Sequence, residues 1–289
     1  MTLREFWHVI LHALQESAVV LPFLFLTYLL MELLEHKASE RAERAIQRAG
    51  KVGPLAGGAL GLVPQCGFSA LASGFYAGRV ISVGTLLAVF LSTSDEMLPV
   101  FLGARIGMEK ILAVLGLKLV VAVLVGFLAD LLWRRRAQFH VEGLCEEEGC
   151  GCGEKGVWLS TLYHTLHIFL FVLLFNLVIG FAMELVGEAA IGRVMRDIPV
   201  LGQLIAALVG LIPNCAASVA IATLYTKGVI SAGAMLAGLL TGAGAGLLVL
   251  FRTNKKPREN LLIVAVLLGS GVLFGTLLDL TGLGVALGL

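Results

Sequence analysis

The sequence predicts an all-α polytopic membrane protein built from two inverted repeats of five segments each, with proline-broken helices. The prediction rests on composition, on recurrent long apolar runs and on an internal repeat. Hydrophobic residues make up 58% of the 289 residues and charged residues only 14%, with a mean hydropathy of +0.94. A soluble domain of this size cannot bury so much apolar surface in one core. The 35 glycines fit helices that pack closely in lipid.

Long apolar stretches recur along the whole chain, and each is long enough to cross ~30 Å of hydrocarbon. Helices are expected, because lipid offers no partners for backbone polar groups. The stretches occupy residues 13–35, 53–78, 80–104, 108–133, 157–186, 198–226, 229–251 and 259–281. The first is expected to be a retained span, because no basic segment precedes it and it is long for a signal peptide.

Two of these stretches are interrupted by proline at matching points. One carries Pro64-Gln65-Cys66-Gly67 and the other Pro213-Asn214-Cys215. Proline removes a helical hydrogen bond and clashes with the preceding turn. Each break favours a hairpin of two short helices, and a single crossing is the alternative.

An internal repeat organises the chain. The segment Gly61–Cys66 (Gly-Leu-Val-Pro-Gln-Cys) reappears as Gly210–Cys215 (Gly-Leu-Ile-Pro-Asn-Cys), at an offset of 149 residues. The same offset relates Ser69 to Ser218, Tyr76 to Tyr225 and Val80–Ser82 to Val229–Ser231. Upstream, an offset of 152 residues relates His12 to His164 and Met31–Leu33 to Met183–Leu185. The chain is therefore a duplication, an architecture found in many secondary transporters.

The duplication predicts a first membrane repeat (residues 1–136), a connecting loop rich in Cys and Glu (137–156) and a second membrane repeat (157–289). Five segments per repeat invert the second repeat, whereas four leave the repeats parallel. The bias of Lys and Arg toward cytoplasmic loops separates these topologies only slightly. Inversion is favoured, because the parallel topology puts Arg134–Arg136 outside and directly next to a span. The inverted topology places the N-terminus outside and the central loop in the cytoplasm.

Five segments carry a resemblance to a known family. They are Leu21–Glu32, Val63–Ser69, Phe90–Glu96, Ile212–Cys215 and Thr241–Gly246. Over nearly its whole length the chain resembles the ten-transmembrane heavy-metal exporters, whose members are labelled arsenic efflux proteins or manganese transporters. The resemblance implies a metal transporter and leaves the metal open. The central loop departs from the family, in which a His-rich tract is frequent, because it contains mainly Cys and Glu.

A run of hydroxyls and carboxylates lies inside the third apolar stretch. It consists of Ser92, Thr93, Ser94, Asp95 and Glu96. Carboxylates in a membrane segment are costly unless they are paired, protonated or bound to a cation. Hard oxygen ligands suit Mn²⁺ and similar ions. The alternatives are a structural network with Lys118 or an interfacial loop between short helices. The matching stretch, Thr241–Gly244, is uncharged, which favours one asymmetric ion site over two equivalent ones.

The two proline breaks supply a second candidate set. Its members are Gln65, Cys66, Ser69, Asn214, Cys215 and Ser218. A pseudo-twofold axis would bring the breaks together near the midplane. Thiolates select soft ions, whereas amide and carbonyl oxygens favour harder ones. The alternative is that both cysteines pack as small hydrophobic residues.

Other ionisable residues lie near the ends of long spans. Glu32 and Glu184 recur in Met-Glu-Leu and are either metal ligands or interfacial groups. A proton relay is expected to draw on His12, His164, His167 and Lys118. No H-E-x-x-H pattern occurs, so the sequence does not support an intramembrane zinc protease.

The acidic central loop contains a candidate site for a thiophilic cation. Its residues are His140, Cys145, Cys150 and Cys152. Thiols and an imidazole can bind Zn²⁺ or Cu⁺, although the spacing is not a standard Cys-x-x-Cys pair. A cytoplasmic location disfavours disulfides. The alternative is a flexible solvated connector.

Together these features predict an exporter of divalent metal ions in the inner membrane, with Mn²⁺ preferred, and not an enzyme. No nucleotide-binding motif is present, so an ion gradient or a separate subunit must supply the energy; proton antiport is expected. No cofactor is expected beyond the transported metal, and the expected partners are the metal ion, the lipid bilayer and a second copy of the chain, but no nucleic acid. Two alternatives stay open. One is export of arsenite or another thiophilic species through Cys66 and Cys215, and the other is a membrane protein that senses metal.

Overall fold

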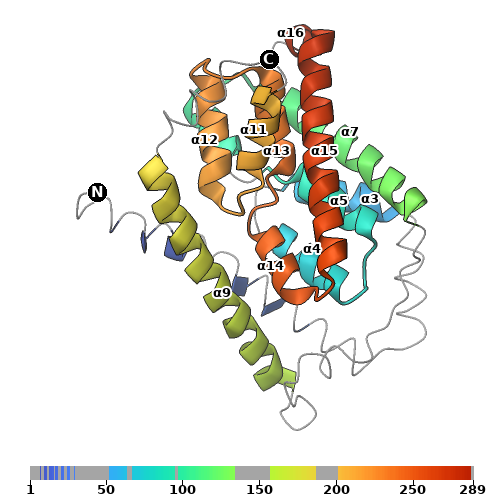
Figure 1. Cartoon of the computed structure of the whole chain (residues 1–289), viewed down its shortest axis with the longest axis vertical. Helices are drawn as coiled ribbons and strands as arrows, with labels where there is room; N and C mark the ends of the chain where they lie inside the picture. Colours follow the sequence, from blue (N-terminus) through green and yellow to red (C-terminus); the bar gives the residue numbers. More distant parts are fainter. Residues whose placement is uncertain are drawn as a thin grey trace.

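The computed structural model describes residues 52–63, 67–94, 97–133, 157–186 and 201–287, with isolated positions between Trp7 and Leu29 (Figure 1). Every regular element in this part of the chain is a helix. Four segments of it are long and apolar enough to cross a membrane: Val83–Gly103, Met108–Leu132, Ala232–Thr253 and Pro257–Thr281. The predicted class, an all-α polytopic membrane protein, is confirmed.

Each of the five described helices between residues 53 and 132 has a counterpart in the second half. The first half contains α3 (Gly53–Gly61), α4 (Gly67–Ala77), α5 (Val83–Ser92), α6 (Met97–Gly103) and α7 (Met108–Leu132). The second contains α9 (Val157–Val186), α11 (Leu201–Gly210), α12 (Cys215–Thr226), α13 (Ala232–Thr241), α14 (Ala245–Thr253), α15 (Pro257–Thr281) and the short α16 (Leu283–Ala286). Both ends of α5 and α7 map onto those of α13 and α15 at the 149-residue offset. The duplication seen in the sequence is therefore a structural repeat.

Equivalent long helices run in opposite directions. In Figure 1, α15 rises from its first residues in the lower half of the view to the top, whereas α7 descends toward the right. A parallel duplication would keep their directions the same. The directions of this pair are those of an inverted repeat, the topology that the sequence favoured.

Both proline breaks separate short helices, as predicted. The helices α3, α4, α11 and α12 contain 9, 11, 10 and 12 residues. Each is roughly 13–18 Å long, about half of the hydrocarbon thickness. These pairs are consequently half-membrane segments, and each stretch predicted at 53–78 and 198–226 is a two-helix hairpin.

Two further interruptions lie in the stretches at 80–104 and 229–251. A loop between short helices was one of the alternatives for the first stretch, whereas no interruption was expected in the second. The first separates α5 from α6, because Thr93 has left the helical conformation with ψ 126°. The second separates α13 from α14, where Gly244 adopts φ 53° and ψ −143°, a conformation that favours glycine. Neither break contains proline, so the strongest sequence signal for a broken helix is missing.

A carboxylate clamp fixes the start of each broken helix. Asp130 of α7 accepts hydrogen bonds from Ser82 Oγ at 2.7 Å and from the Gly84 amide at 2.8 Å. Ser82 also caps α5 by accepting from the Thr85 amide. An anion at a helix N-terminus satisfies free amides and complements the helix dipole. The clamp therefore sets where α5 begins and holds it against α7.

The second repeat contains the same clamp with one additional donor. Asp279 of α15 accepts from Ser231 Oγ at 2.6 Å, from the Gly233 amide at 2.8 Å and from Gln203 Nε2 of α11 at 2.6 Å. Pro54 occupies the position equivalent to Gln203 and has no such donor. Asp279 consequently joins three helices where Asp130 joins two.

The broken helices form the centre of the protein. Residues 84–92 of α5 and 233–241 of α13 are buried, with α7 and α15 packed against them. Long apolar side chains of α7 and α15 point outward, among them Leu131 and Leu280, which are 72% and 77% exposed. This pattern fits helices that face lipid around a protein-lined interior. The helices α4 and α12 also cross between the halves, α4 packing along α14 and α12 against α6.

Candidate functional site

The ends of α5 and α13 meet in the interior, with Lys118 of α7 between them. Its Nζ donates to the main-chain oxygen of Thr93, directly after α5. It also donates to the main-chain oxygen of Leu239, in the last turn of α13, at 2.8 Å. The side chain of Lys118 is fully buried. Lys118 lies roughly 15 Å along α7 from its first residue, about half of the hydrocarbon thickness. The two interruptions therefore meet deep in the membrane segment.

Three of the predicted oxygen ligands lie at the end of α5 and are buried. Ser92 Oγ donates to the main-chain oxygens of Ala88 and Val89, and Thr93 Oγ1 also donates to that of Val89. Ser94 Oγ donates to the main-chain oxygen of Ser92 at 2.8 Å. Each hydroxyl uses its proton locally and keeps lone pairs that can coordinate a cation. The arrangement is thus compatible with cation binding at this break.

Thr241, the position equivalent to Ser92, holds α13 against the neighbouring hairpin. Its Oγ1 donates to the main-chain oxygen of Ala207 in α11 at 2.8 Å. A Cβ on Gly210 would lie 2.4 Å from that Oγ1, and a Cβ on Gly61 would lie 2.1 Å from Ser92 Oγ. The first helix of each hairpin is therefore packed against a hydroxyl at the end of a broken helix. Thr241 has this packing role whether or not it also contacts an ion.

Two predicted serines gather at the break of the second repeat. Ser69 lies on α4, the helix of the first half that packs along α14 of the second half. A Cβ added to Gly246 of α14 would lie 2.6 Å from the Ser69 Cβ. Ser73, one turn later, donates to the main-chain oxygen of Gly246 at 2.7 Å. Ser218 of α12 lies on the other side, where a Cβ on Gly242 would be 3.0 Å from its Oγ. The structure thus brings Ser69 and Ser218 together around residues 242–246.

Asn214 is buried and forms the N-cap of α12. Its Oδ1 accepts from the Ala216 amide at 2.7 Å, and its backbone is extended. The cap places the positive end of the α12 dipole at Cys215, the first residue of the helix. The described residues thus set the helix start at Cys215, and the role of its thiol stays a prediction.

Several predicted site residues lie outside the described part of the chain. These are His12, Glu32, Gln65, Cys66, Asp95, Glu96, His140, Cys145, Cys150 and Cys152. His164, Glu184 and Cys215 lie in described helices, but their side chains are not described. Among the described residues, no group of three His, Cys, Asp or Glu side chains could hold a metal ion. The carboxylate and thiol ligand sets consequently stay predictions.

His167 lies on the exposed side of α9, beside α14. Its Nε2 contacts Arg252 Nη2, and its ring stacks on Tyr163 at a centroid distance of 6.3 Å. The Arg252 guanidinium also lies over the Phe171 ring, 5.9 Å from its centroid. The predicted relay residue is thus next to a permanent positive charge, and its role in proton transfer stays a prediction.

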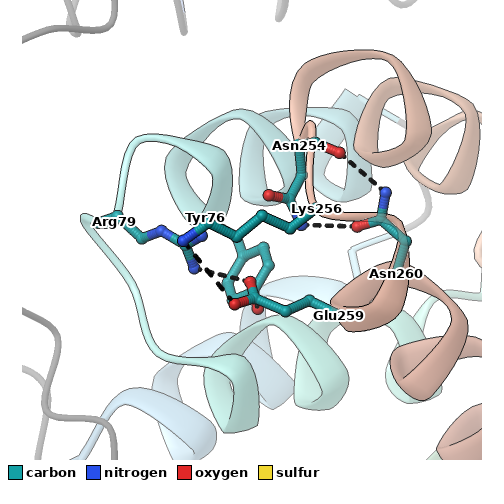
Figure 2. A network of polar contacts seen from close by, with 6 residues as sticks. All are labelled: Tyr76, Arg79, Asn254, Lys256, Glu259 and Asn260. Atoms are coloured by element: carbon teal, nitrogen blue, oxygen red, sulfur yellow. Dashed lines mark hydrogen bonds and ion pairs between the residues drawn. The ribbon is translucent and has the colours of Figure 1, made fainter.

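Figure 2 shows a polar network that joins the two halves where the α4–α5 connection meets the start of α15. Arg79 Nη1 lies 3.0 Å from Glu259 Oε2, and Tyr76 donates its hydroxyl to the same oxygen at 3.3 Å. The Arg79 guanidinium lies 5.4 Å from the centre of the Tyr76 ring. To its right in Figure 2, Asn254 Nδ2 donates to Asn260 Oδ1 at 2.6 Å, and Asn260 donates back to the Asn254 main chain. One end of the interface between the halves is therefore polar and ion-paired.

Sequence reasoning missed the clamps and this ion pair. Asp130 and Asp279 are related by the same 149-residue offset that revealed the repeat, so the offset could have identified them. Arg79 and Glu259 had no such signal, because their counterparts are Gly228 and Lys110. That ion pair exists on one side of the pseudo-symmetry only.

Comparison with known protein families identifies the family to which the chain belongs. A family model described as "Putative, 10TM heavy-metal exporter" matches residues 7–188 and again residues 159–285. The chain belongs to this family. The two matches overlap at residues 159–188: the first runs from the first repeat through α9, and the second covers most of the second repeat. The resemblance seen in the five sequence segments is confirmed. Among curated proteins and solved structures, none matches the chain. Membership of the heavy-metal exporter family agrees with the duplicated helical architecture and with a multi-pass membrane location.

Proposed function

We propose that this protein exports divalent metal ions in exchange for protons, with Mn²⁺ as the preferred substrate. The observation that carries the proposal is the meeting of the α5 and α13 ends at buried Lys118 in a member of a heavy-metal exporter family. Non-helical main chain at membrane depth is tolerated only inside protein or along an aqueous cavity. Discontinuous helices at repeat interfaces bind substrate in many transporters.

The metal ligands in this proposal come from the α5–α6 break. Asp95 and Glu96 follow Ser94 directly in the chain, and the proposal adds their carboxylates to the buried hydroxyls of that break. Carboxylate, hydroxyl and carbonyl oxygens suit Mn²⁺ and other hard divalent ions. The second repeat offers only Gly242-Ala243-Gly244 at the equivalent position. One asymmetric ion site is therefore proposed, with Ser69, Ser218 and Thr241 around the uncharged break.

Proton exchange follows from the same ligands. A carboxylate that releases a metal ion can take a proton, which lets one site alternate between the two cargoes. Glu32 and Glu184 are the proposed additional carboxylates, and His12, His164 and His167 the proposed path for protons. The alternation of access is proposed to occur between the two inverted repeats.

The orientation in the proposal follows the distribution of basic residues. Arg79, Arg252, Lys255, Lys256 and Arg258 cluster at the α4–α5 and α14–α15 connections. The opposite end has Arg105, Lys110 and Lys227. Cytoplasmic loops carry an excess of Lys and Arg, which places the first cluster and the central loop in the cytoplasm. Export across the inner membrane then proceeds toward the end at α6–α7.

A second candidate function is export of arsenite or another thiophilic species through Cys66 and Cys215. The observation that favours it is the Asn214 cap, which puts the positive end of α12 at Cys215. Purified protein in proteoliposomes distinguishes the candidates. Mn²⁺ flux driven by an imposed pH gradient, without arsenite flux, supports the first. Arsenite flux alone supports the second, and no flux of either, with metal binding to the central loop, supports a sensor.

A further inference from the structure

Lys118 occupies an unusual chemical position, because its ammonium lies where two helices end. The carbonyl of Leu239 is one of the last four carbonyls of α13. The last four carbonyls of a helix have no N–H partner within the helix. The amide of Ala243, its partner in a continued helix, bonds to Thr241 instead. The carbonyl of Thr93 lies just past α5. Lys118 Nζ donates to both oxygens across the two halves of the protein.

The two helix ends favour a cation at this point. Each helix C-terminus carries an effective charge of about −0.5, so two that meet carry about −1. An ammonium ion has the opposite sign. In broken-helix transporters, unwound carbonyls and half-helix C-termini are the groups that coordinate monovalent cations. The Lys118 side chain is fully buried and its ammonium occupies this position. A cation from solvent therefore cannot bind there in the wild-type protein.

The other repeat provides a natural comparison. Leu267 stands at the position equivalent to Lys118, is also fully buried, and packs in the apolar core with Leu240 and Leu247. The fold therefore does not need a lysine at this position in each repeat. The ammonium is specific to the side where the α5–α6 break carries Asp95 and Glu96 in the sequence.

We propose that Lys118 is a tethered monovalent cation that fills a carbonyl site between the ends of α5 and α13. It takes the place of a diffusible Na⁺ or K⁺, so that transport does not require either ion. In this role Lys118 holds the site through its covalent tether, which differs from the proton relay expected for this residue. The proposal concerns the coupling ions of the proposed metal exporter, but the cation site itself can be tested without transport.

The test removes the amine and offers cations in its place. Lys118→Ala opens the carbonyl site, Lys118→Met fills it with apolar atoms, and Leu267→Ala removes a similar buried volume in the other repeat. Each protein is purified in detergent, and its thermal unfolding is measured in choline, Na⁺, K⁺ and methylammonium chloride. Any ion that binds the folded state raises the unfolding temperature with its concentration.

The expected result is that Lys118→Ala unfolds several degrees lower in choline and regains stability with Na⁺, K⁺ or methylammonium. Wild type, Leu267→Ala and Lys118→Met should not distinguish these salts from choline. Stability of Lys118→Ala that is the same in every salt, whether high or low, overturns the proposal. Equal salt responses in Leu267→Ala and Lys118→Ala also overturn it, because the response would then be unspecific.

A transport measurement separates this proposal from the proposed function. In proteoliposomes, wild-type Mn²⁺ flux should be independent of Na⁺ and K⁺. Flux through Lys118→Ala should fall at least tenfold in choline and recover with the cation that restores its stability. If wild type carries no metal while the stability response is present, the proposed function fails and the cation site stands. If wild-type flux requires Na⁺ or K⁺, the tethered-cation proposal fails and the exporter stands.

Discussion

Arg79 and Glu259 form an ion pair across the boundary between the two halves, with 3.0 Å between Nη1 and Oε2. At the pseudo-symmetric position the pair is replaced by Gly228 and Lys110, which cannot form one. Lys256 lies 3.9 Å from the second oxygen of Glu259 and adds a further positive charge. The interface is thus ion-paired at the end with the basic connections, and the equivalent pair is absent at the other end.

Removing this pair should weaken the contact between the halves. Arg79→Gln and Glu259→Gln are each expected to lower the unfolding temperature in detergent. A partly exposed pair of this kind has a coupling free energy of about 0.5–1 kcal/mol. The double variant should therefore lose less stability than the two single variants lose together. The swap Arg79→Glu with Glu259→Arg should recover part of the lost stability. Losses that simply add would show that the two side chains do not interact.

The clamps should be unequal in strength. A hydrogen bond to a charged group contributes about 1.5–3 kcal/mol, and the low end of this range applies here because Asp130 is half-buried and Asp279 is exposed. Asp279 accepts from three donors and Asp130 from two, so Asp279→Asn should destabilise more than Asp130→Asn. Glu109→Gln, at an exposed position in the first turn of α7, is the control and should have little effect. The check is thermal unfolding, and the reverse order would contradict the assignment of Gln203 to the clamp.

The contact of α4 with α14 should be sensitive to a single methyl group. Gly246→Ala puts a Cβ 2.6–2.8 Å from Ser69 atoms that include its main chain, so one helix must move. Overpacking of this kind costs about 1–3 kcal/mol. Gly116→Ala and Gly269→Ala, where a Cβ meets nothing within 4 Å, should be neutral or slightly stabilising. Equal stability for all three variants would mean that α4 and α14 do not pack in this way.

The central loop should affect metal loading without carrying the transport step. Replacing Cys145, Cys150 and Cys152 together by Ser removes the thiols expected to bind a thiophilic cation. Zn²⁺ binding to the purified protein should fall, while Mn²⁺ flux in proteoliposomes should persist. Complete loss of flux in a folded triple variant would place these cysteines in the transport pathway.

The sequence could predict the repeat, the helical class and the proline breaks because each depends on local residue identity. Pro213 and the 149-residue offset are visible in the chain itself. The break after Thr241 was missed, since it depends on the positive φ of Gly244 rather than on proline. A network of Lys118 with residues 92–96 was among the alternatives, and Thr93 is one of its partners, but the contact with the Leu239 main chain required the fold. Asp130 and Asp279 were predictable from the offset, whereas Arg79 and Glu259 required the fold.

The most direct test of the account compares hard-ion and soft-ion ligands in one assay. Mn²⁺ and arsenite flux are measured in proteoliposomes for wild type, Asp95→Asn and the double variant Cys66→Ser with Cys215→Ser. Asp95→Asn removes a charged oxygen ligand with little change of shape, so it should abolish Mn²⁺ flux. The double cysteine variant should only weaken that flux, since a hydroxyl still offers oxygen. Normal Mn²⁺ flux through Asp95→Asn, with all flux lost in the double cysteine variant, would contradict the manganese proposal and support a thiophilic substrate.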